Sequence, residues 1–318
     1  MRILKETHID FMSKTGLAGL LSATLIIAGI VSMVMNGGPK LSIDFKGGTM
    51  VAVNFTDSVD INEIRSAIAN VSIDGQTFDF SKAEIKYFGA VGVDALLGKL
   101  DETNVAVRLA SMDNEPEQFS QKFVDKMAEV YPELVPENRA EFVLSIEKVG
   151  PKIGAELSGD AVMAILSALA LILVYISIRF EFKYAVGAIA ALTHDVVITL
   201  GIFSLLGYEV SLAVVAAFLT IVGYSLNDTI VIFDRVRENV KALKSATLGS
   251  VINQSINESL SRTIITSLTT FFVVLILFLV GGEVIHTFSF AMIIGVIIGT
   301  YSSIFIASPV LIRMGANN

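Results

Sequence analysis

Several kinds of functional group are missing or scarce in this sequence of 318 residues. It has no cysteine, so neither a disulfide nor a thiolate metal or redox site can form. Its three histidines, His8, His194 and His286, lie far apart and do not have zinc-ligand spacing. There is no phosphate-binding loop and no dinucleotide fingerprint. We therefore predict that the chain is not an enzyme and uses no cofactor.

Charged residues are also scarce, at 17% of the chain, whereas about 25% is usual for a soluble domain. Hydrophobic residues make up 53%, the mean hydropathy is +0.69, and the apolar residues occur in blocks. The first block, Thr15–Met35, is uncharged and long enough to cross a bilayer. A cleaved signal peptide is the alternative, but no small-x-small cleavage site follows Met35. We predict that residues 1–36 form a short N-terminus and a first transmembrane helix.

Five more apolar blocks lie in residues 159–318. We place these spans at about 161–178, 184–206, 211–233, 264–281 and 288–311. With six spans, the basic residues outside the large polar segment all fall on one side of the membrane, many of them in a basic loop predicted at 234–263. The positive-inside rule then places both termini in the cytoplasm of a bacterial inner-membrane protein.

The polar segment 37–158 carries the whole net charge of −8. Its pattern predicts a strand pair over Leu41–Phe55, interrupted at Gly47-Gly48, and then further elements in the order helix, strand, strand, helix, strand. These are placed at Asp60–Asn70, Ala83–Phe88, Asn104–Leu109, Glu115–Tyr131 and Arg139–Val149, with Phe142, Leu144 and Ile146 on one face of the last strand. This β-α-β-β-α-β order predicts a ferredoxin-like α+β domain on the periplasmic side.

Two carboxylates lie within predicted spans, where ionisable residues are rare and tend to be functional. Asp195 follows His194 in the third span, and Asp228 follows Asn227 in the fourth. A buried carboxylate must pair or take up a proton, so either residue can carry a proton or bind a small cation. A polar stripe made of Thr220, Tyr224 and Asn227 borders Asp228.

Arg262 is the natural partner of Asp228, and it shares a helix face with Thr266 and Thr269. We expect the two to pair in one state and separate in another. The alternatives are a static ion pair or an arginine that snorkels to the interface. Small residues also recur every fourth position, which predicts close helix packing. They are Ala291, Gly295, Gly299 and Ser303 in the last span, and Gly187 and Ala191 in the third.

Several motifs carry a resemblance to a known family. Residues 223–239 read GYSLNDTIVIFDRVREN, and shorter motifs are SRT at 261–263, DFKGGT at 44–49, VGP at 149–151 and LTHD at 192–195. In order and spacing they resemble the SecF family, membrane subunits of the SecDF accessory complex of bacterial protein export. The resemblance covers nearly the whole chain, and the run around Asp228 is its most specific part.

The resemblance implies a fold of the resistance-nodulation-division type and a function in late-stage protein export driven by the transmembrane ion gradient, with H⁺ or Na⁺ as the coupling ion. By position, Asp228 matches the ion-relay aspartate, Arg262 its partner, and Asp195 a His-Asp motif of less defined role. The implied partners are SecD, the SecYEG channel, YajC, YidC, unfolded exported polypeptides and membrane lipid, with no nucleic acid.

Three other functions compete with this interpretation. An efflux pump of the same superfamily usually carries both halves in one chain. An intramembrane aspartyl protease needs Gly-x-Gly-Asp, whereas Ser225-Leu226-Asn227 precede Asp228. A passive scaffold of the translocation channel would show no ion flux. The outer domain, in turn, either binds unfolded polypeptide along an open sheet edge or only docks onto a partner.

Overall fold

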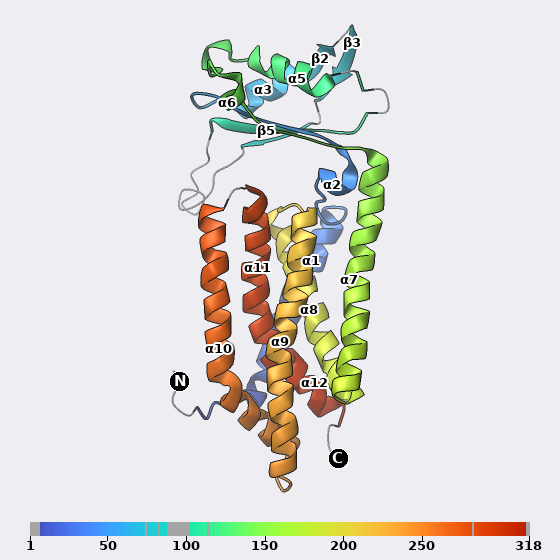
Figure 1. The fold of residues 1–318 in the computed structure, drawn as a ribbon, viewed down its shortest axis with the longest axis vertical. Helices are drawn as coiled ribbons and strands as arrows, with labels where there is room; N and C mark the ends of the chain where they lie inside the picture. Colours follow the sequence, from blue (N-terminus) through green and yellow to red (C-terminus); the bar gives the residue numbers. More distant parts are fainter. Residues whose placement is uncertain are drawn as a thin grey trace. The chain divides into compact units, whose positions relative to one another are not determined.

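The computed structural model describes residues 7–73, 75–81, 83–87, 102–112, 115–116, 118–281 and 283–315. The chain divides into two compact units. The sheet unit comprises residues 41–160 and 279–286, and the helical unit comprises residues 1–40, 161–278 and 287–318 (Figure 1).

The sheet unit contains one four-stranded antiparallel sheet with the strand order β4-β5-β1-β6. The strands are β1 (Gly48–Asn54), β4 (Glu84–Tyr87), β5 (Asn104–Leu109) and β6 (Val143–Val149). Helix α3 (Ile61–Ile68) follows β1, and α5 (Phe119–Ala128) precedes β6. This is the predicted ferredoxin-like plan, with an added hairpin of β2 (Asn70–Ile73) and β3 (Gln76–Asp79) between α3 and β4. Phe88, the predicted end of β4, lies outside the described residues.

A compact apolar core explains why these elements form. Val51 and Val53 alternate along β1 and are buried against helix residues such as Ile64 and Phe123. Asp60 caps α3, because its carboxylate accepts a hydrogen bond from the Asn62 amide at 2.7 Å. Core and caps are thus both supplied by the polar segment itself, which agrees with a domain that buries its own hydrophobic surface.

The predicted strand pair at Leu41–Phe55 is wrong in its first half. Residues Ile43–Lys46 form the helical turn α2, capped by the Ser42 hydroxyl, because the chain reverses at Gly47. Gly48 adopts φ +130° and lies so close to β5 that a Cβ would approach the Leu109 carbonyl oxygen to 2.4 Å. Ile43 and Phe45 are both buried in this turn, which accounts for the apolar residues that resemble a strand pattern in the sequence.

The predicted strand at Arg139–Val149 is also shorter in the structure. Asn138 caps the turn α6 (Arg139–Phe142), so β6 begins only at Val143. Phe142 is buried, whereas Leu144 is 45% exposed and Ile146 is 38% exposed. The two exposed side chains follow from the position of β6 at the edge of the sheet.

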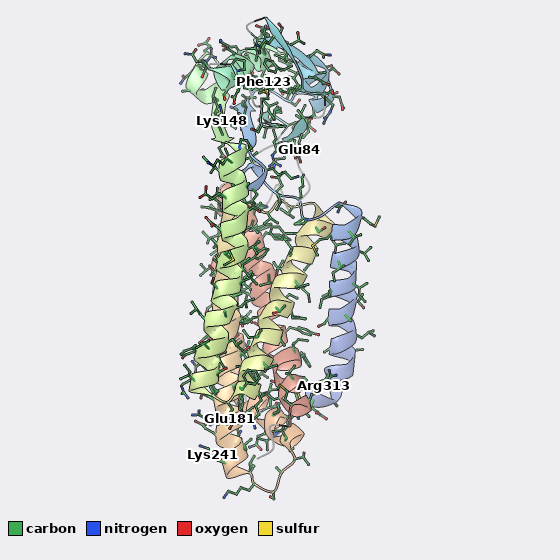
Figure 2. All side chains as sticks on the ribbon, turned by 90° about the vertical axis from the view of Figure 1, so that its right-hand side faces the viewer. Glu84, Phe123, Lys148, Glu181, Lys241 and Arg313 are labelled. Carbon is green, nitrogen blue, oxygen red and sulfur yellow. The ribbon has the colours of Figure 1, made fainter. Side chains whose placement is uncertain are left out.

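Six helices in the described chain are long and apolar enough to cross a membrane, as predicted. They are α1 (Thr15–Met35, preceded by the short turn η1, Met12–Lys14), α7 (Pro151–Arg179), α8 (Phe182–Leu206), α9 (Leu212–Ala242), α10 (Leu248–Val280), and a last span of α11 (Glu283–Ser302), the π-helical η3 (Ser303–Ala307) and α12 (Ser308–Arg313). Glu181, Lys241 and Arg313 all lie at one end of the helical unit, as labelled in Figure 2.

The basic loop predicted at 234–263 is mostly helical. Helix α9 continues to Ala242 and α10 begins at Leu248, so only residues 243–247 connect them. The apolar residues of this part of α10 recur with helical spacing and are buried on one side, whereas the polar residues between them lower its mean hydropathy. A prediction based on the length of the apolar runs alone therefore ends helix α9 too early and begins helix α10 too late.

Candidate functional site

The centre of the helical unit is packed through small residues. A Cβ on Gly295 of α11 would lie 2.2 Å from the Ile221 side chain of α9, and one on Gly299 would lie 3.0 Å from Ser225. Gly187 of α8 packs equally closely on the Ala307 carbonyl oxygen. The predicted small-residue positions therefore do lie at helix contacts, and these bring polar groups of three helices together.

Asp195 lies at this centre and is fully buried. Its Oδ2 accepts hydrogen bonds from the Ser225 hydroxyl at 2.6 Å and from the Ser302 hydroxyl at 2.8 Å. Its Oδ1 lies 3.0 Å from His194 Nδ1. The carboxylate thus joins α8, α9 and α11 through contacts that satisfy both of its oxygens.

The hydrogen-bonded cluster continues from His194 into α1. His194 Nε2 lies 2.9 Å from the Ser22 hydroxyl, which lies 2.9 Å from the Tyr301 hydroxyl. The Tyr301 hydroxyl in turn donates to the Ala18 carbonyl oxygen at 2.5 Å. This chain of contacts makes α1 part of the same polar core.

Asp228 is also buried, but its contacts are weaker. The Ser267 hydroxyl of α10 donates to its Oδ2 at 3.4 Å, and the same hydroxyl lies 2.6 Å from the Thr300 hydroxyl of α11. The neighbouring buried hydroxyls of Tyr224, Thr229 and Thr263 have no hydrogen-bond partner among the described residues. Asp228 is thus a desolvated acid with little compensation, next to hydroxyls that a water molecule or a hydrated cation would satisfy.

The structure does not bring Arg262 onto Asp228. Within the described residues, no ion pair joins their side chains within 4.0 Å, and Arg262 is exposed on α10. Thr266, on the same face, donates only to the backbone carbonyl oxygen of Arg262. The arrangement corresponds to the separated state of the pair that the sequence predicts.

An exposed polar stripe runs along α9 and α10 beside Asp228. Thr220 and Asn227 of α9 and Arg262 and Thr269 of α10 are all exposed in the isolated chain. Polar side chains facing lipid at this depth are unfavourable, so such a face usually contacts protein or water.

At the end of the helical unit that carries Glu181, Lys241 and Arg313, polar contacts join α9 and α10 beyond the apolar spans. The buried amide of Asn239 donates to Ser255 at 3.0 Å and to Glu258 at 2.9 Å, and Arg235 pairs with Glu258 at 2.7 Å. Asn253 and Asn257 accept from the backbone amides of Phe11 and Ile9. The N-terminal segment is therefore attached to α10 at this end.

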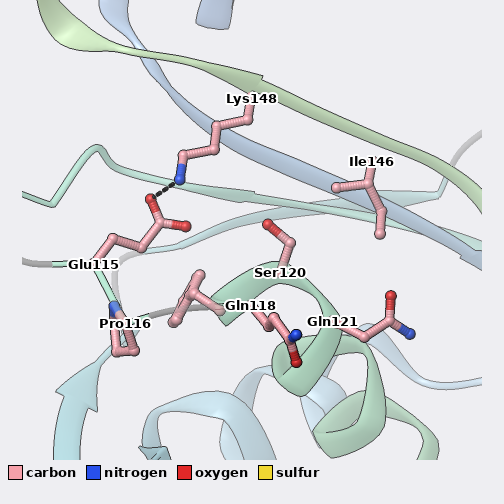
Figure 3. A pocket seen from close by; sticks show the side chains of 8 residues that line it. Glu115, Pro116, Gln118, Ser120, Gln121, Ile146 and Lys148 are labelled. Atoms are coloured by element: carbon pink, nitrogen blue, oxygen red, sulfur yellow. Dashed lines mark ion pairs between the residues drawn. The ribbon is translucent and has the colours of Figure 1, made fainter.

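The sheet unit has a separate surface cavity of about 490 Å³ beside the edge strand β6. Figure 3 shows Ile146 and Lys148 of β6 facing the start of α5, with Lys148 paired to Glu115 at 2.5 Å. No group of three or more potential metal ligands occurs in the part of the chain that the structure describes.

Sequence reasoning identified both aspartates and His194 but missed most of their partners. Ser22, Ser225, Ser267, Thr300, Tyr301 and Ser302 all lie in spans where hydroxyl residues are common. Their contacts with the carboxylates are made between helices, as between Ser225 of α9 and Asp195 of α8, so spacing along one helix gives no signal for them.

Comparison with known proteins bears directly on this arrangement. Residues 133–317 match the family described as "Protein export membrane protein SecD/SecF, C-terminal". The protein translocase subunit SecF of Calditerrivibrio nitroreducens is 43% identical over 309 residues, which cover 96% of this chain and 94% of the relative. The chain belongs to the SecF family. The SecF of Rhodothermus marinus is 41% identical, with 99% and 96% of the two chains covered.

Among solved structures, the crystal structure of SecDF from Thermus thermophilus, described as a translocon-associated membrane protein, matches with a TM-score of 0.80 and 33% identity. A SecDF structure in a super-membrane-facing form matches with a TM-score of 0.65 and 34% identity. This SecF chain is covered to 98% in both comparisons, but it spans only 39% of either SecDF chain. The names of these relatives are those of transport proteins, consistent with the prediction that the chain is not an enzyme.

Proposed function

We propose that this SecF-family chain works with SecD as an accessory subunit of the Sec protein translocase and uses the transmembrane ion gradient to promote late-stage export of polypeptides. The observation that carries the proposal is Asp228, a buried carboxylate with one long hydrogen bond, which Arg262 on the neighbouring helix attracts electrostatically without forming an ion pair. Such a group can change its charge state at a low structural cost, because few contacts are lost when it does.

The energetics of the gradient are sufficient for this role. One elementary charge that crosses 100 mV releases about 2.3 kcal/mol, so a few ions per cycle supply several kcal/mol. We propose that protonation of Asp228 opens its contact with Arg262 and that deprotonation restores it. The separation of the two side chains fits the open arrangement of this proposal, in which the change is transmitted along α9 and α10, the helices that carry the two residues.

The exposed polar stripe of α9 and α10 supports a partner in the membrane. We propose that SecD covers Thr220, Asn227, Arg262 and Thr269, since SecF spans less than half of the SecDF chains that it matches. This contact would place Arg262 and the buried Asp228 beside a protein surface instead of lipid. The positive-inside rule assigns the end with Glu181, Lys241 and Arg313 to the cytoplasm and the sheet unit to the periplasm.

A test of the proposal is reporter export in cells that lack the native SecF, with abundance and SecD association measured in parallel. Asp228→Asn should assemble but abolish the stimulation of export, because the amide cannot change charge. Asp228→Glu should retain part of it. Asp234→Asn is the matched control, because this residue is 40% exposed on α9 and makes only long ion pairs, with Arg179 at 3.7 Å and with Arg237 at 4.0 Å. Normal export by Asp228→Asn would favour the passive scaffold.

The edge strand β6 is the best candidate for contact with exported polypeptide. Leu144 and Ile146 are exposed on a strand that, among the described strands, pairs with β1 only, and an extended chain can add to such an edge through backbone hydrogen bonds. A photo-crosslinker at residue 146 should capture an arrested export substrate, whereas one at Lys122 of α5, which does not line the cavity beside β6, should not. Equal labelling at both positions would argue for a domain that only docks onto a partner.

A further inference from the structure

The hydrogen-bond chain from Asp195 to α1 ends on a group that cannot donate. The Ala18 carbonyl oxygen has no hydrogen, so the Tyr301 hydroxyl, 2.5 Å away, must donate to it. A phenol has one hydrogen, and that hydrogen is therefore used. The 2.9 Å contact between Ser22 and Tyr301 then requires the Ser22 hydroxyl to donate.

The same reasoning places a hydrogen on Nε2 of the His194 ring. Because the single hydrogen of Ser22 points at Tyr301, His194 Nε2 must carry a hydrogen to make its 2.9 Å contact with Ser22. The alternative ring form, with Nε2 bare, would leave either the Ser22–Tyr301 or the Tyr301–Ala18 oxygen pair in contact without any hydrogen between them. Two facing oxygen lone pairs in a buried site are unfavourable.

One more hydrogen is needed on the other side of the ring. His194 Nδ1 and Asp195 Oδ1 lie 3.0 Å apart, so a hydrogen belongs either to the ring, as an imidazolium, or to the carboxyl group. Both cases give the pair the same composition and zero net charge. The side chains that contact the pair are Ser22 of α1, Ser225 of α9 and Ser302 of α11, with Tyr301 stacked on the ring; none of them carries a charge.

We infer that His194 and Asp195 form a second proton-binding site, which holds one proton at zero net charge and stays loaded while Asp228 changes its charge. The inference deepens the proposed function, because it assigns different parts to the two buried carboxylates. Asp195 has strong contacts to three helices and acts as the loaded, neutral junction of α1, α8, α9 and α11. Asp228, with a single long contact, is left as the residue that exchanges its ion.

The neutrality of the pair also bears on the choice of ion. Asp195 Oδ2 already accepts two hydrogen bonds, and Asp195 Oδ1 either accepts the hydrogen of His194 Nδ1 or donates its own hydrogen to that nitrogen. A sodium ion needs oxygen lone pairs that are free to coordinate it. The His194–Asp195 site therefore takes protons and excludes metal cations, whatever ion Asp228 uses.

The test is nitrogen NMR of the histidine ring in the full chain, reconstituted in lipid nanodiscs. The chain has only three histidines, so replacement of His8 and His286 by Asn leaves a single labelled ring. We expect Nε2 to be protonated, with Nδ1 either protonated or hydrogen-bonded to a carboxyl proton. A ring with a hydrogen on Nδ1 only and a bare Nε2 would mean a pair of charge −1 and would overturn the inference.

A pair of tyrosine variants tests the part assigned to the chain of hydroxyls. Tyr301→Phe frees the Ser22 hydrogen to point at Nε2, so a larger share of the rings should have a bare Nε2 than in the unmodified chain. Tyr224→Phe is the matched control, since this buried hydroxyl has no partner among the described residues. Identical ring-nitrogen spectra for Tyr301→Phe and the unmodified chain would also overturn the inference. Because the spectrum reads protonation and not export, failure here is distinct from failure of the proposed function.

Discussion

Helices α1 and α8 cross at Gly29 and Gly201, and this crossing allows a demanding test of the packing. A Cβ on Gly29 would lie 2.6 Å from the Cα of Gly201, whereas nonbonded carbon atoms normally rest about 3.5–4.0 Å apart. The obstacle is backbone, so no side chain can rotate away. Gly29→Ala must therefore separate the helices by about 1 Å, with an overpacking cost of about 1–3 kcal/mol.

The same displacement should reach the polar core. Ser22 lies two turns before Gly29 on the buried side of α1, so a shift of about 1 Å stretches its 2.9 Å contact with His194 beyond hydrogen-bonding distance. We expect Gly29→Ala to lower the thermal unfolding midpoint of the purified chain and to change the ring-nitrogen spectrum of His194.

Gly19→Ala on the same helix is the control for this experiment. A Cβ there would have nothing within 4 Å, so the substitution should be neutral or slightly stabilising, because alanine favours a helix more than glycine does. Gly201→Ala should reproduce the effect of Gly29→Ala, since its Cβ would lie 2.9 Å from the Gly29 Cα. Equal midpoints for Gly29→Ala and Gly19→Ala would refute the reasoning.

Two further predictions concern other parts of the chain. Asn239→Ala removes a buried amide that donates to Ser255 and Glu258, and it should lower the unfolding midpoint by the equivalent of about 1–3 kcal/mol. Arg235→Gln removes two partly exposed ion pairs, with Glu238 and Glu258, each worth about 1 kcal/mol or less. A larger effect of Arg235→Gln would contradict this ranking. Phe123→Ala in the sheet core should cost about 3–5 kcal/mol and make the sheet unit sensitive to limited proteolysis, whereas Leu144→Ala on the exposed edge should not.

The sequence predicts the six candidate spans because each contains a long apolar run, and it predicts the sheet plan because hydrophobic residues of the polar segment recur with strand or helix spacing. Its errors occur where a local cap decides the structure. Ser42 and Asn138 each start a helical turn inside a segment that alternates like a strand, and the buried stripe of α10 continues through polar residues. Hydropathy averages are insensitive to all three signals.

The residues of the candidate site were likewise predicted only in part. Asp195 and Asp228 are conspicuous because a carboxylate is rare in an apolar span. The identity of their partners depends on helix rotation and on close approach at Gly29, Gly295 and Gly299, which no single-helix pattern determines. The separated position of Arg262 is likewise a property of the tertiary structure, because helical spacing places it on a face but cannot measure its distance from Asp228.

The pairing of β1 with β6 has a mechanical consequence. The first and last strands of the sheet unit are neighbours, and Gly48 pairs with Val149 at the end where the chain enters and leaves the sheet. A load that pulls these two connections apart breaks the ladder one rung at a time from that end, whereas a load that moves them together leaves every rung intact. The close approach of Gly154 to the Phe45 carbonyl oxygen, where a Cβ would come within 2.8 Å, holds the two connections side by side. The β1–β6 ladder should therefore stay intact when the two connections move together. It should open only if the connections are pulled in opposite directions.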